Sequence, residues 1–154
     1  MGSKADLEHA KKILAPIKKM SVECVIRIAS AHKVPLKALD ILKEYEKDEA
    51  VYITVAGRSN ALSGFVDANT EKPVIACPPY SEKFGGNDIY STIRMPSGVC
   101  PMLVLEPEEA GLAALKILAL KDKALVKKIK DFQQTKKDDL EKDDKELQSH
   151  SFFL

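Results

Sequence analysis

The sequence lacks tryptophan and has only three cysteines and three histidines among its 154 residues. The cysteines (Cys24, Cys77 and Cys100) have no metal-ligand spacing, and each lies in an apolar stretch. We therefore expect buried free thiols in a reducing compartment, which predicts a cytoplasmic protein. Paired His, Cys and Asp ligands and a Gly-Lys-Ser/Thr phosphate loop are also missing. The missing ligand pairs argue against a structural zinc, and the missing loop argues against ATP binding through a phosphate loop.

Long apolar runs and a surplus of one charge are missing too. No run approaches the ~18 residues of a membrane-spanning helix, and we expect no signal peptide. The 24 basic and 23 acidic residues give a formal net charge of +1. No overall field therefore favours nucleic acid or a membrane surface as a partner. The length fits one globular domain.

Helical and β-branched patterns alternate along the first 120 residues. Apolar residues at helical spacing predict helices over residues 6–20, 35–45, 62–69, 88–94 and 107–120. Short β-rich runs predict strands over residues 24–29, 51–56, 74–77 and 102–105. This alternation is typical of an α/β protein with a parallel sheet and helices on both faces. In such sheets the ligand lies beyond the carboxyl ends of the strands.

The remainder of the chain is rich in Lys, Asp and Glu. Leu125, Ile129 and Phe132 have helical spacing, which predicts a helix that docks by these residues and is solvated after about Lys136. A charged, exposed face is the simplest interpretation, and a contact with a neighbouring subunit is the alternative. The predicted organisation is a domain of residues 1–120, a helix of residues 121–148 within that domain or at an oligomer contact, and a disordered tail of residues 149–154.

The first candidate site is the turn Met1-Gly2-Ser3-Lys4-Ala5-Asp6, directly before a predicted helix. Glycine lets backbone N–H groups approach an anion, and a helix N-terminus favours negative charge. Ser3 can donate to a phosphate, and Asp6 can accept from ribose hydroxyls. Alternatively, Ser3 or Asp6 simply caps the helix.

Only one histidine follows a predicted strand. His32 lies in a turn beside Ser30 and Lys33, where an imidazole can take and return a proton near neutral pH. His9 lies within the first predicted helix, as a surface or partly packed residue, and His150 lies in the tail. A purely structural role for His32 is the alternative to catalysis.

A polar loop follows the second predicted strand. Gly57, Arg58, Ser59 and Asn60 offer backbone N–H groups, a hydroxyl, an amide and a guanidinium, which suit a carboxylate or a phosphate. An ordinary capped loop is the alternative. Cys77-Pro78-Pro79 follows the third predicted strand and ends it sharply.

These pieces, in this order, resemble one family. They are Ser30-Ala31-His32-Lys33, Ala56-Gly57-Arg58-Ser59-Asn60, Pro73-Val74-Ile75-Ala76-Cys77-Pro78-Pro79 and Arg94-Met95-Pro96-Ser97-Gly98. The sequence looks like the phosphoribosylaminoimidazole (AIR) carboxylase family of purine biosynthesis, from Met1 to about Leu120. The resemblance implies a flavodoxin-like α/β/α sandwich, here with a C-terminal helical extension, and a homo-oligomer, either a tetramer or an octamer.

The family has two branches that differ in the loop after Gly57. One is a mutase that moves the carboxyl group of N-carboxyaminoimidazole ribonucleotide, and a second histidine stands in its loop where Ala61 stands here. The other is a carboxy-lyase that reversibly joins carbon dioxide to aminoimidazole ribonucleotide, without a cofactor or metal. This sequence is similar to the second branch.

The resemblance also implies roles for individual residues. His32 is the expected acid/base residue. Ser3, Asp6, Ser30 and Lys33 are expected to hold the ribose phosphate. Gly57, Arg58, Ser59 and Asn60 are expected to position the carboxylate or carbon dioxide, while Pro78 and Pro79 shape the pocket wall.

Two departures from the family pattern keep alternatives open. Ala5 stands where a second serine is usual, which removes one hydroxyl from the phosphate turn. In the family an apolar strand precedes the Met-Gly-Ser turn, whereas this sequence begins at the turn. Either the start lies upstream, or the sheet lacks an inner strand and exposes two unpaired edges. The alternatives to a carboxylase are the mutase, a ribonucleotide-binding relative without catalysis, and a flavodoxin-like electron carrier.

Overall fold

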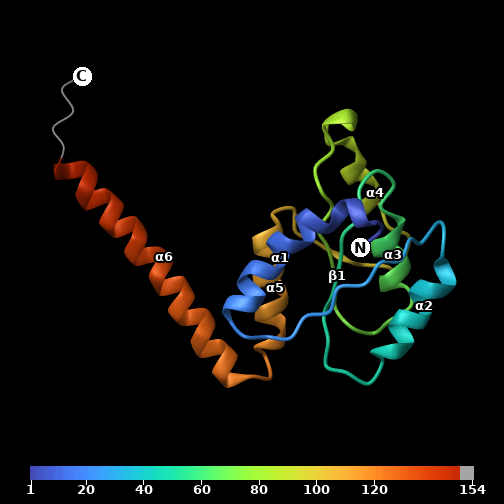
Figure 1. Ribbon diagram of the computed structural model, residues 1–154, viewed down its shortest axis with the longest axis horizontal. Coiled ribbons are helices and arrows are strands. Elements are labelled where there is room, and N and C mark those ends of the chain that lie inside the picture. Colours follow the sequence, from blue (N-terminus) through green and yellow to red (C-terminus); the bar gives the residue numbers. More distant parts are fainter. Residues whose placement is uncertain (150–154) are drawn as a thin grey trace.

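A parallel sheet lies at the centre of the computed structural model, which describes residues 1–149 (Figure 1). Its three strands are β1 (Tyr52–Thr54), β2 (Val74–Ala76) and β3 (Met102–Leu103), in the order β1-β2-β3. Ile53 pairs with Ile75, and Ala76 pairs with Leu103. All of β2 is buried, as expected for a parallel strand that is covered on both faces.

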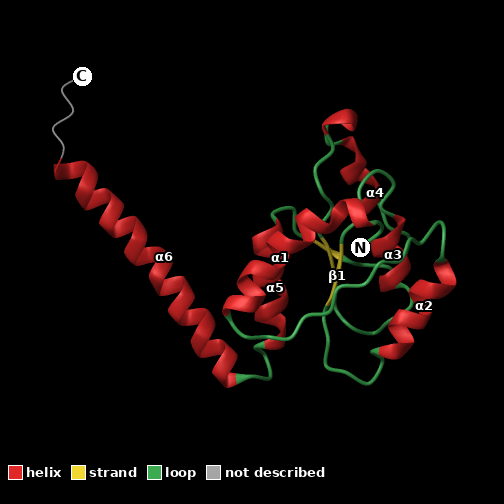
Figure 2. Ribbon diagram, in the orientation of Figure 1, coloured by secondary structure: helices red, strands yellow, loops and turns green. Residues whose placement is uncertain are grey.

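Helices cover both faces of the sheet (Figure 2). The helices α1 (Leu7–Lys19) and α5 (Pro107–Leu118) pack on one face, where Ile13 and Leu115 join Ile75 in the larger core cluster. The helices α2 (Pro35–Glu44) and α3 (Ala61–Asp67) cover the other face, where Leu42 and Val66 contact Val74. The shorter elements are η1 (Lys4–Asp6), η2 (Glu82–Phe84), η3 (Asn87–Ile89) and α4 (Tyr90–Ile93). The predicted three-layer α/β/α architecture is therefore confirmed.

Helices α1 and α5 approach each other closely at Gly111. A Cβ atom added there would lie 2.3 Å from the Ile13 carbonyl oxygen and 2.8 Å from Pro16 Cγ. Only a residue without a side chain fits at this crossing. The close approach explains how the two helices bury Ala110 and Ala114 completely or almost completely.

The predicted strand over residues 24–29 is wrong. The segment is extended but forms no ladder with β1, and the sheet has three strands rather than four. Its backbone bonds to Met1 at one end, through the Arg27 carbonyl oxygen and the Ala29 N–H. The remainder has no partner strand within the described residues, because a gap separates it from β1.

The helix α6 (Lys123–Ser149) projects from the domain (Figure 1). Leu125 and Ile129 are buried, Phe132 packs against the same core, and the Lys128 Nζ atom donates to the Met20 carbonyl oxygen over 2.7 Å. The remaining turns are exposed, as predicted. Residues 150–154, most of the predicted tail, lie outside the described residues. In the described part of the chain, no helix has the length and apolar character to cross a membrane.

The prediction of three buried thiols holds for one residue. Cys77 at the end of β2 is buried, whereas Cys24 and Cys100 are exposed. Cys24 lies on the unpaired extended segment, and Cys100 lies in the loop before β3, so neither is enclosed by a second layer. All three are free thiols.

Candidate active site

Three of the predicted loops meet beside the first two residues. The Ala29 N–H donates to the Met1 carbonyl oxygen over 3.0 Å, and the Gly2 N–H donates to the Val55 carbonyl oxygen over 2.8 Å. These bonds set the turn that carries His32 and the loop that begins at Gly57 on either side of the Gly2 turn. The site therefore lies at the carboxyl edge of the sheet, where a parallel architecture binds ligands.

The Gly2 turn is held together by Asp6. Its Oδ2 atom accepts from the Ser3 N–H over 2.9 Å and from the Ser3 hydroxyl over 3.1 Å. The structure therefore shows the helix cap that Sequence analysis gave as the alternative role of Ser3 and Asp6. Ser3 is also exposed. A Cβ atom at Gly2 would lie 3.4 Å from the Ala56 Cβ atom, so the turn packs tightly on the next loop.

His32 lies in a short turn with its side chain exposed. Ser30 forms the turn, because its carbonyl oxygen accepts from the Val34 N–H over 2.9 Å and its hydroxyl accepts from the Lys33 N–H over 3.3 Å. No hydrogen bond or ion pair of the described residues involves the His32 ring. Both ring nitrogens are therefore available to a ligand.

Arg58 adopts a left-handed backbone conformation, with φ of 61°. This conformation is uncommon for a residue with a side chain and costs about 1–3 kcal/mol. Asp88 and Ser91 stabilise it: the Arg58 N–H donates to Asp88 Oδ2 over 3.0 Å, and its carbonyl oxygen accepts from the Ser91 hydroxyl over 3.3 Å. The Arg58 and Ser59 side chains are left exposed at the edge of the site.

Asn60 does not present its amide to the site as predicted. The residue is 1% exposed, and its Nδ2 atom donates to the Thr92 hydroxyl over 2.8 Å. Its Oδ1 atom accepts from the Ser63 N–H at the start of α3, and its own N–H donates to the Ser91 hydroxyl. Asn60 therefore fixes the shape of the Arg58 loop.

Pro78 and Pro79 line the same edge. A Cβ atom at Gly57 would lie 3.5 Å from Pro79 Cγ and 3.8 Å from Asp88 Oδ2. Gly57 thus packs between the proline wall and the loop that carries Asp88. Both prolines are half-buried.

Sequence analysis missed the residues that support this edge. Asp88, Ser91 and Thr92 are about thirty positions away from the loop that they hold, so no local pattern marks them. It also missed the contact of His9 with Cys77, whose Nε2 and Sγ atoms are 3.3 Å apart. Helical spacing put His9 on α1 but did not indicate that it faces the end of β2.

Comparison with known proteins identifies the family of the chain. The model of the family described as AIR carboxylase matches residues 1–139. The chain belongs to the AIR carboxylase family. A phosphoribosylaminoimidazole carboxylase from Archaeoglobus fulgidus is 62% identical over 147 residues, which cover 96% of this chain and 82% of that protein. One from Treponema denticola is 48% identical over 149 residues, with 96% and 94% of the two chains covered.

A solved structure gives the same fold. The crystal structure of Treponema denticola PurE superposes with a TM-score of 0.92 at 48% identity, over 96% of this chain and 94% of that one. The bifunctional mouse protein, which combines a phosphoribosylaminoimidazole carboxylase with a succinocarboxamide synthetase, is 41% identical over 122 residues. Those residues cover 78% of this chain and 29% of the mouse protein. The predicted family and flavodoxin-like fold are both confirmed.

Proposed function

We propose that this chain is a phosphoribosylaminoimidazole carboxylase, a carboxy-lyase that reversibly carboxylates aminoimidazole ribonucleotide with carbon dioxide. The observation that carries the proposal is the meeting of three loops beside Met1 and Gly2, fixed by the Ala29 and Gly2 hydrogen bonds. It brings a free imidazole, the Gly2 turn and a cationic loop to one edge. Relatives named carboxylase at 62% and 48% identity support the same activity.

The reaction needs one carbon–carbon bond and one proton transfer. The electron-rich ring carbon of the substrate attacks carbon dioxide, and one C=O π bond opens to form a carboxylate. The ring carbon then carries both a hydrogen and the carboxylate. A base removes that proton, and the C–H electron pair restores the aromatic ring. Decarboxylation is the same sequence in reverse, with the proton returned to carbon.

His32 is the proposed base and acid. Its ring is exposed and uses no nitrogen for a structural hydrogen bond within the described residues, so it can bind and release a proton at the substrate. The Ser30 hydrogen bonds fix the backbone of the turn. The orientation of the His32 ring is therefore set by the torsions of its own side chain. Positioning of the two reactants can supply much of the remaining rate enhancement.

The ribose phosphate is proposed to lie at the Gly2 turn. Ser3 and Lys33 are exposed, and both can donate to phosphate oxygens, while the N-terminal end of α1 favours negative charge. Asp6 and Ser30 complete the set of proposed ligands. On phosphate binding, the Ser3 hydroxyl would exchange Asp6 for a phosphate oxygen and leave the backbone cap in place.

The carboxylate is proposed to face Arg58 and Ser59, whose side chains are exposed beside the proline wall of Pro78 and Pro79. Asn60 enters the proposal as a positioning residue, because its amide is used by Thr92 and Ser63. Gly57 leaves room between Pro79 and Asp88 for the backbone of this loop.

The test compares two substrates with the purified chain. Aminoimidazole ribonucleotide with labelled bicarbonate and no ATP should give a product that carries the label in the carboxylate on its ring carbon. Product from N-carboxyaminoimidazole ribonucleotide alone would reject the carboxylase in favour of the mutase. Ribonucleotide binding without turnover of either substrate would reject both in favour of a non-catalytic relative.

The proposal also covers assembly and location. Leu140 and Leu147 on α6 are 70% and 59% exposed, which supports burial against another copy in a tetramer or octamer. Sedimentation of the full chain should therefore give a multiple of the 17.0 kDa chain mass, and a chain that ends at Lys136 a smaller multiple. The free thiols support a cytoplasmic location.

A further inference from the structure

The contact of His9 with Cys77 joins two elements that carry different parts of the proposed site. His9 is half-buried in the first turn of α1, and Cys77, directly after β2, is 0% exposed. The His9 Nε2 and Cys77 Sγ atoms are 3.3 Å apart. Within residues 1–149, no other hydrogen bond joins α1 to residues 74–77. This contact is therefore the polar connection between α1 and the end of β2.

On the α1 side, His9 belongs to the helix end that holds the Gly2 turn. Asp6 directly precedes α1 and accepts from both the N–H and the hydroxyl of Ser3. His9 follows Asp6 by three positions, which places the two residues on the same side of the helix start. A shift of this helix end therefore moves Asp6, and Ser3 moves with it.

On the β2 side, Cys77 directly precedes the proline wall. The Cys77 N–H donates to the Thr54 carbonyl oxygen over 2.9 Å, which continues the ladder between β1 and β2. Pro78 and Pro79 follow, and Pro79 packs beside Gly57. Because the sheet fixes the backbone of Cys77, His9 is held to a fixed point beside the wall.

The thiol of Cys77 serves two neighbours. Its S–H group donates to the Leu105 carbonyl oxygen over 3.7 Å, a weak hydrogen bond, so its sulfur is left to accept from the His9 Nε2–H. Burial, followed by the nearby Glu106 and Glu108 carboxylates, raises the pKa of Cys77 to about 12, so the thiol keeps its proton at neutral pH. His9 is therefore the donor in this contact.

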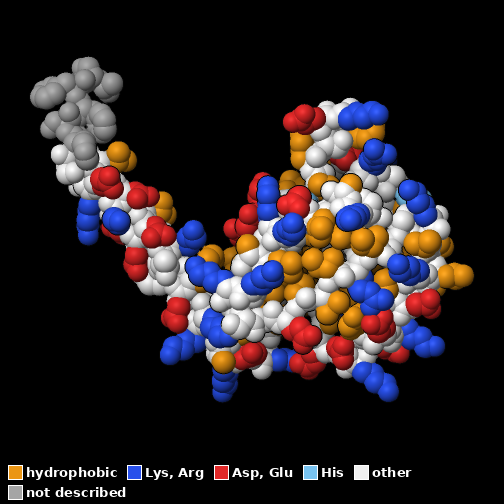
Figure 3. All heavy atoms as spheres, viewed as in Figure 1, with side chains coloured by type: hydrophobic (Ala, Val, Ile, Leu, Met, Phe, Trp, Pro, Cys, Tyr) orange, Lys and Arg blue, Asp and Glu red, His pale blue; other side chains and the backbone are white. Residues whose placement is uncertain are grey.

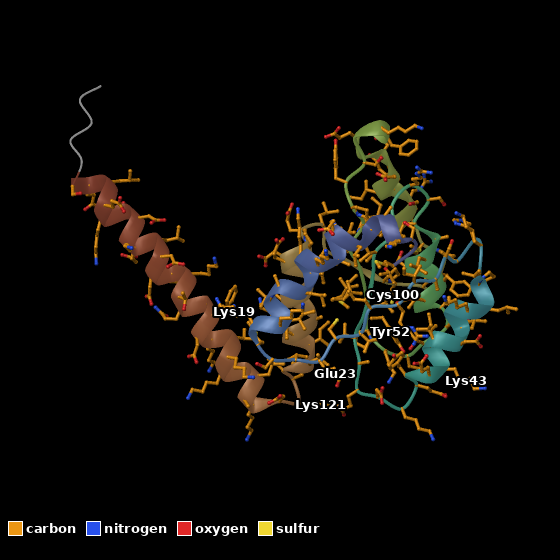
Figure 4. The ribbon with its side chains drawn as sticks, viewed as in Figure 1. Lys19, Glu23, Lys43, Tyr52, Cys100 and Lys121 are labelled. Atoms are coloured by element: carbon orange, nitrogen blue, oxygen red, sulfur yellow. The ribbon has the colours of Figure 1, made fainter. Side chains whose placement is uncertain are left out.

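From its middle onward, α1 is held by packing. Ile13 and Pro16 pack against Gly111 of α5, and hydrophobic side chains gather beside α1 in the middle of the globular part (Figure 3). Lys19, which marks the C-terminal end of α1 in Figure 4, has its Nζ atom 5.3 Å from the centre of the Phe132 ring. Apolar contacts have no preferred direction. The hydrogen bond of His9 therefore sets the position of the opposite end of α1, which carries the Gly2 turn.

We propose that His9 is a positioning residue for the ribonucleotide, which acts through Cys77 to hold the Gly2 turn at a fixed distance from the proline wall. This inference rests on the proposed binding of the ribose phosphate at that turn. A hydrogen bond has a defined length and direction, and a displacement of about 1 Å in a site is enough to impair it. His9 makes no contact with the substrate in this role.

The proposed role has a kinetic signature. The phosphate does not change during carboxylation, so the Gly2 turn binds it equally in the ground state and in the transition state. Loss of the positioning should therefore raise the KM for aminoimidazole ribonucleotide and leave kcat nearly unchanged. Partial unfolding would instead reduce the amount of active protein and lower the apparent kcat. The two effects are thus separable.

Two variants of His9 provide a matched test. In His9→Gln the side-chain amide nitrogen takes the place of Nε2 and can still donate to Cys77. In His9→Asn the shorter side chain places this nitrogen near the position of Nδ1, out of reach of the sulfur. Burial lowers the pKa of His9, so at about pH 8 the natural ring is as uncharged as both variants. The charges of the nearby Lys12, Asp6 and Glu108 are then the same in all three proteins.

His9→Asn should raise both the KM and the calorimetric dissociation constant of the ribonucleotide about tenfold, whereas His9→Gln should stay within about twofold of the natural chain. Binding of the riboside, which lacks the phosphate, should be equal in the two variants. In a Cys77→Ala background the two variants should also bind the ribonucleotide equally, because the acceptor is gone. Equal ribonucleotide affinity of His9→Asn and His9→Gln in the natural background would overturn the proposal. An equal loss for the riboside would overturn it as well.

Calorimetry keeps this test separate from that of the proposed function. A natural chain that binds the ribonucleotide without carboxylating it would refute the carboxylase, and the two variants would still decide the role of His9. A natural chain that carboxylates the ribonucleotide, with the same KM in both variants, would refute the role of His9 alone. A natural chain that does not bind the ribonucleotide would overturn both proposals.

Discussion

The Nε2 atom of His9 lies 3.3 Å from the Sγ atom of Cys77, which joins α1 to the end of β2. Burial lowers the pKa of His9, and the hydrogen bond to Cys77 only partly opposes this effect. Burial, followed by the nearby Glu106 and Glu108 carboxylates, raises the pKa of Cys77 to about 12. Both groups are therefore neutral near pH 7, with Cys77 buried and His9 half-buried beside the end of β2.

The first prediction concerns the stability of the protein in acid. Because the folded pKa of His9 lies below 6.5, the unfolded chain takes up the proton at a higher pH than the folded chain. The contribution of His9 to the free energy of unfolding is therefore fully present well above pH 6.5 and is lost as the pH falls through 6.5 toward the folded pKa. Between about pH 7.5 and about pH 5.5, the free energy of unfolding measured with urea should fall more for the natural chain than for His9→Gln. Equal losses of unfolding free energy in the two proteins would show that His9 is not the source of this pH dependence.

The second prediction concerns thiol reactivity. With a pKa of about 12, only about one Cys77 in ten thousand is a thiolate at about pH 8. Iodoacetamide should therefore modify Cys100 in the folded protein and leave Cys77 unmodified, as measured by peptide mass spectrometry. Urea should make both residues reactive. Rapid modification of Cys77 in the folded chain would show that the end of β2 is open to solvent.

The third prediction tests the close crossing of α1 and α5. Gly111→Ala places a methyl group against the Ile13 backbone, which cannot move aside without shifting the helix. The free energy of unfolding should fall by about 1–3 kcal/mol. Gly64→Ala is the matched control, because its methyl group meets the flexible end of Met95, at 2.9 Å, and Val99 Cγ1 only at an ordinary contact distance of 3.7 Å. A smaller loss for Gly111→Ala than for Gly64→Ala would be inconsistent with the described packing.

The fourth prediction separates support of the Arg58 loop from direct substrate contact. Asn60→Ala leaves the Thr92 hydroxyl and the Ser63 N–H without their partner, so stability should fall by about 1–3 kcal/mol. Carboxylation should fall as well. Ser59→Ala, on the exposed neighbour, should reduce activity without a comparable loss of stability. An unchanged free energy of unfolding for Asn60→Ala would contradict the positioning role of Asn60.

Most of the fold could be predicted because apolar spacing is a local signal. The helices that contain Ile13, Leu42 and Leu115 formed close to their expected bounds, and so did the helix docked by Leu125 and Ile129. The strand over residues 24–29 failed for a non-local reason. Its β-branched residues favour a strand, but a ladder also needs a neighbour at hydrogen-bonding distance, which β1 does not provide.

The candidate site was predictable only in part. Ser30, His32, Arg58 and Pro79 follow strand ends, where parallel topology brings them to a common edge. Sequence cannot show that the Asn60 amide turns inward, because its partner Thr92 lies in a different element. For the same reason, a side chain of suitable chemistry can be identified beforehand, whereas its orientation depends on contacts that only folding creates.

The fifth prediction tests the acid/base role of His32, the central claim. His32→Asn removes the titratable ring from an exposed turn and breaks no hydrogen bond of the described residues. The free energy of unfolding in urea should therefore stay within about 0.5 kcal/mol of that of the natural chain. Ribonucleotide binding, measured by calorimetry, should be retained.

The decisive measurement is the rate at which the His32→Asn protein incorporates labelled bicarbonate into aminoimidazole ribonucleotide. Loss of general acid–base catalysis should lower kcat by about 100-fold or more, with little change in substrate affinity. A folded, ribonucleotide-binding His32→Asn protein with a kcat near that of the natural chain would contradict the assignment of the proton transfer to His32.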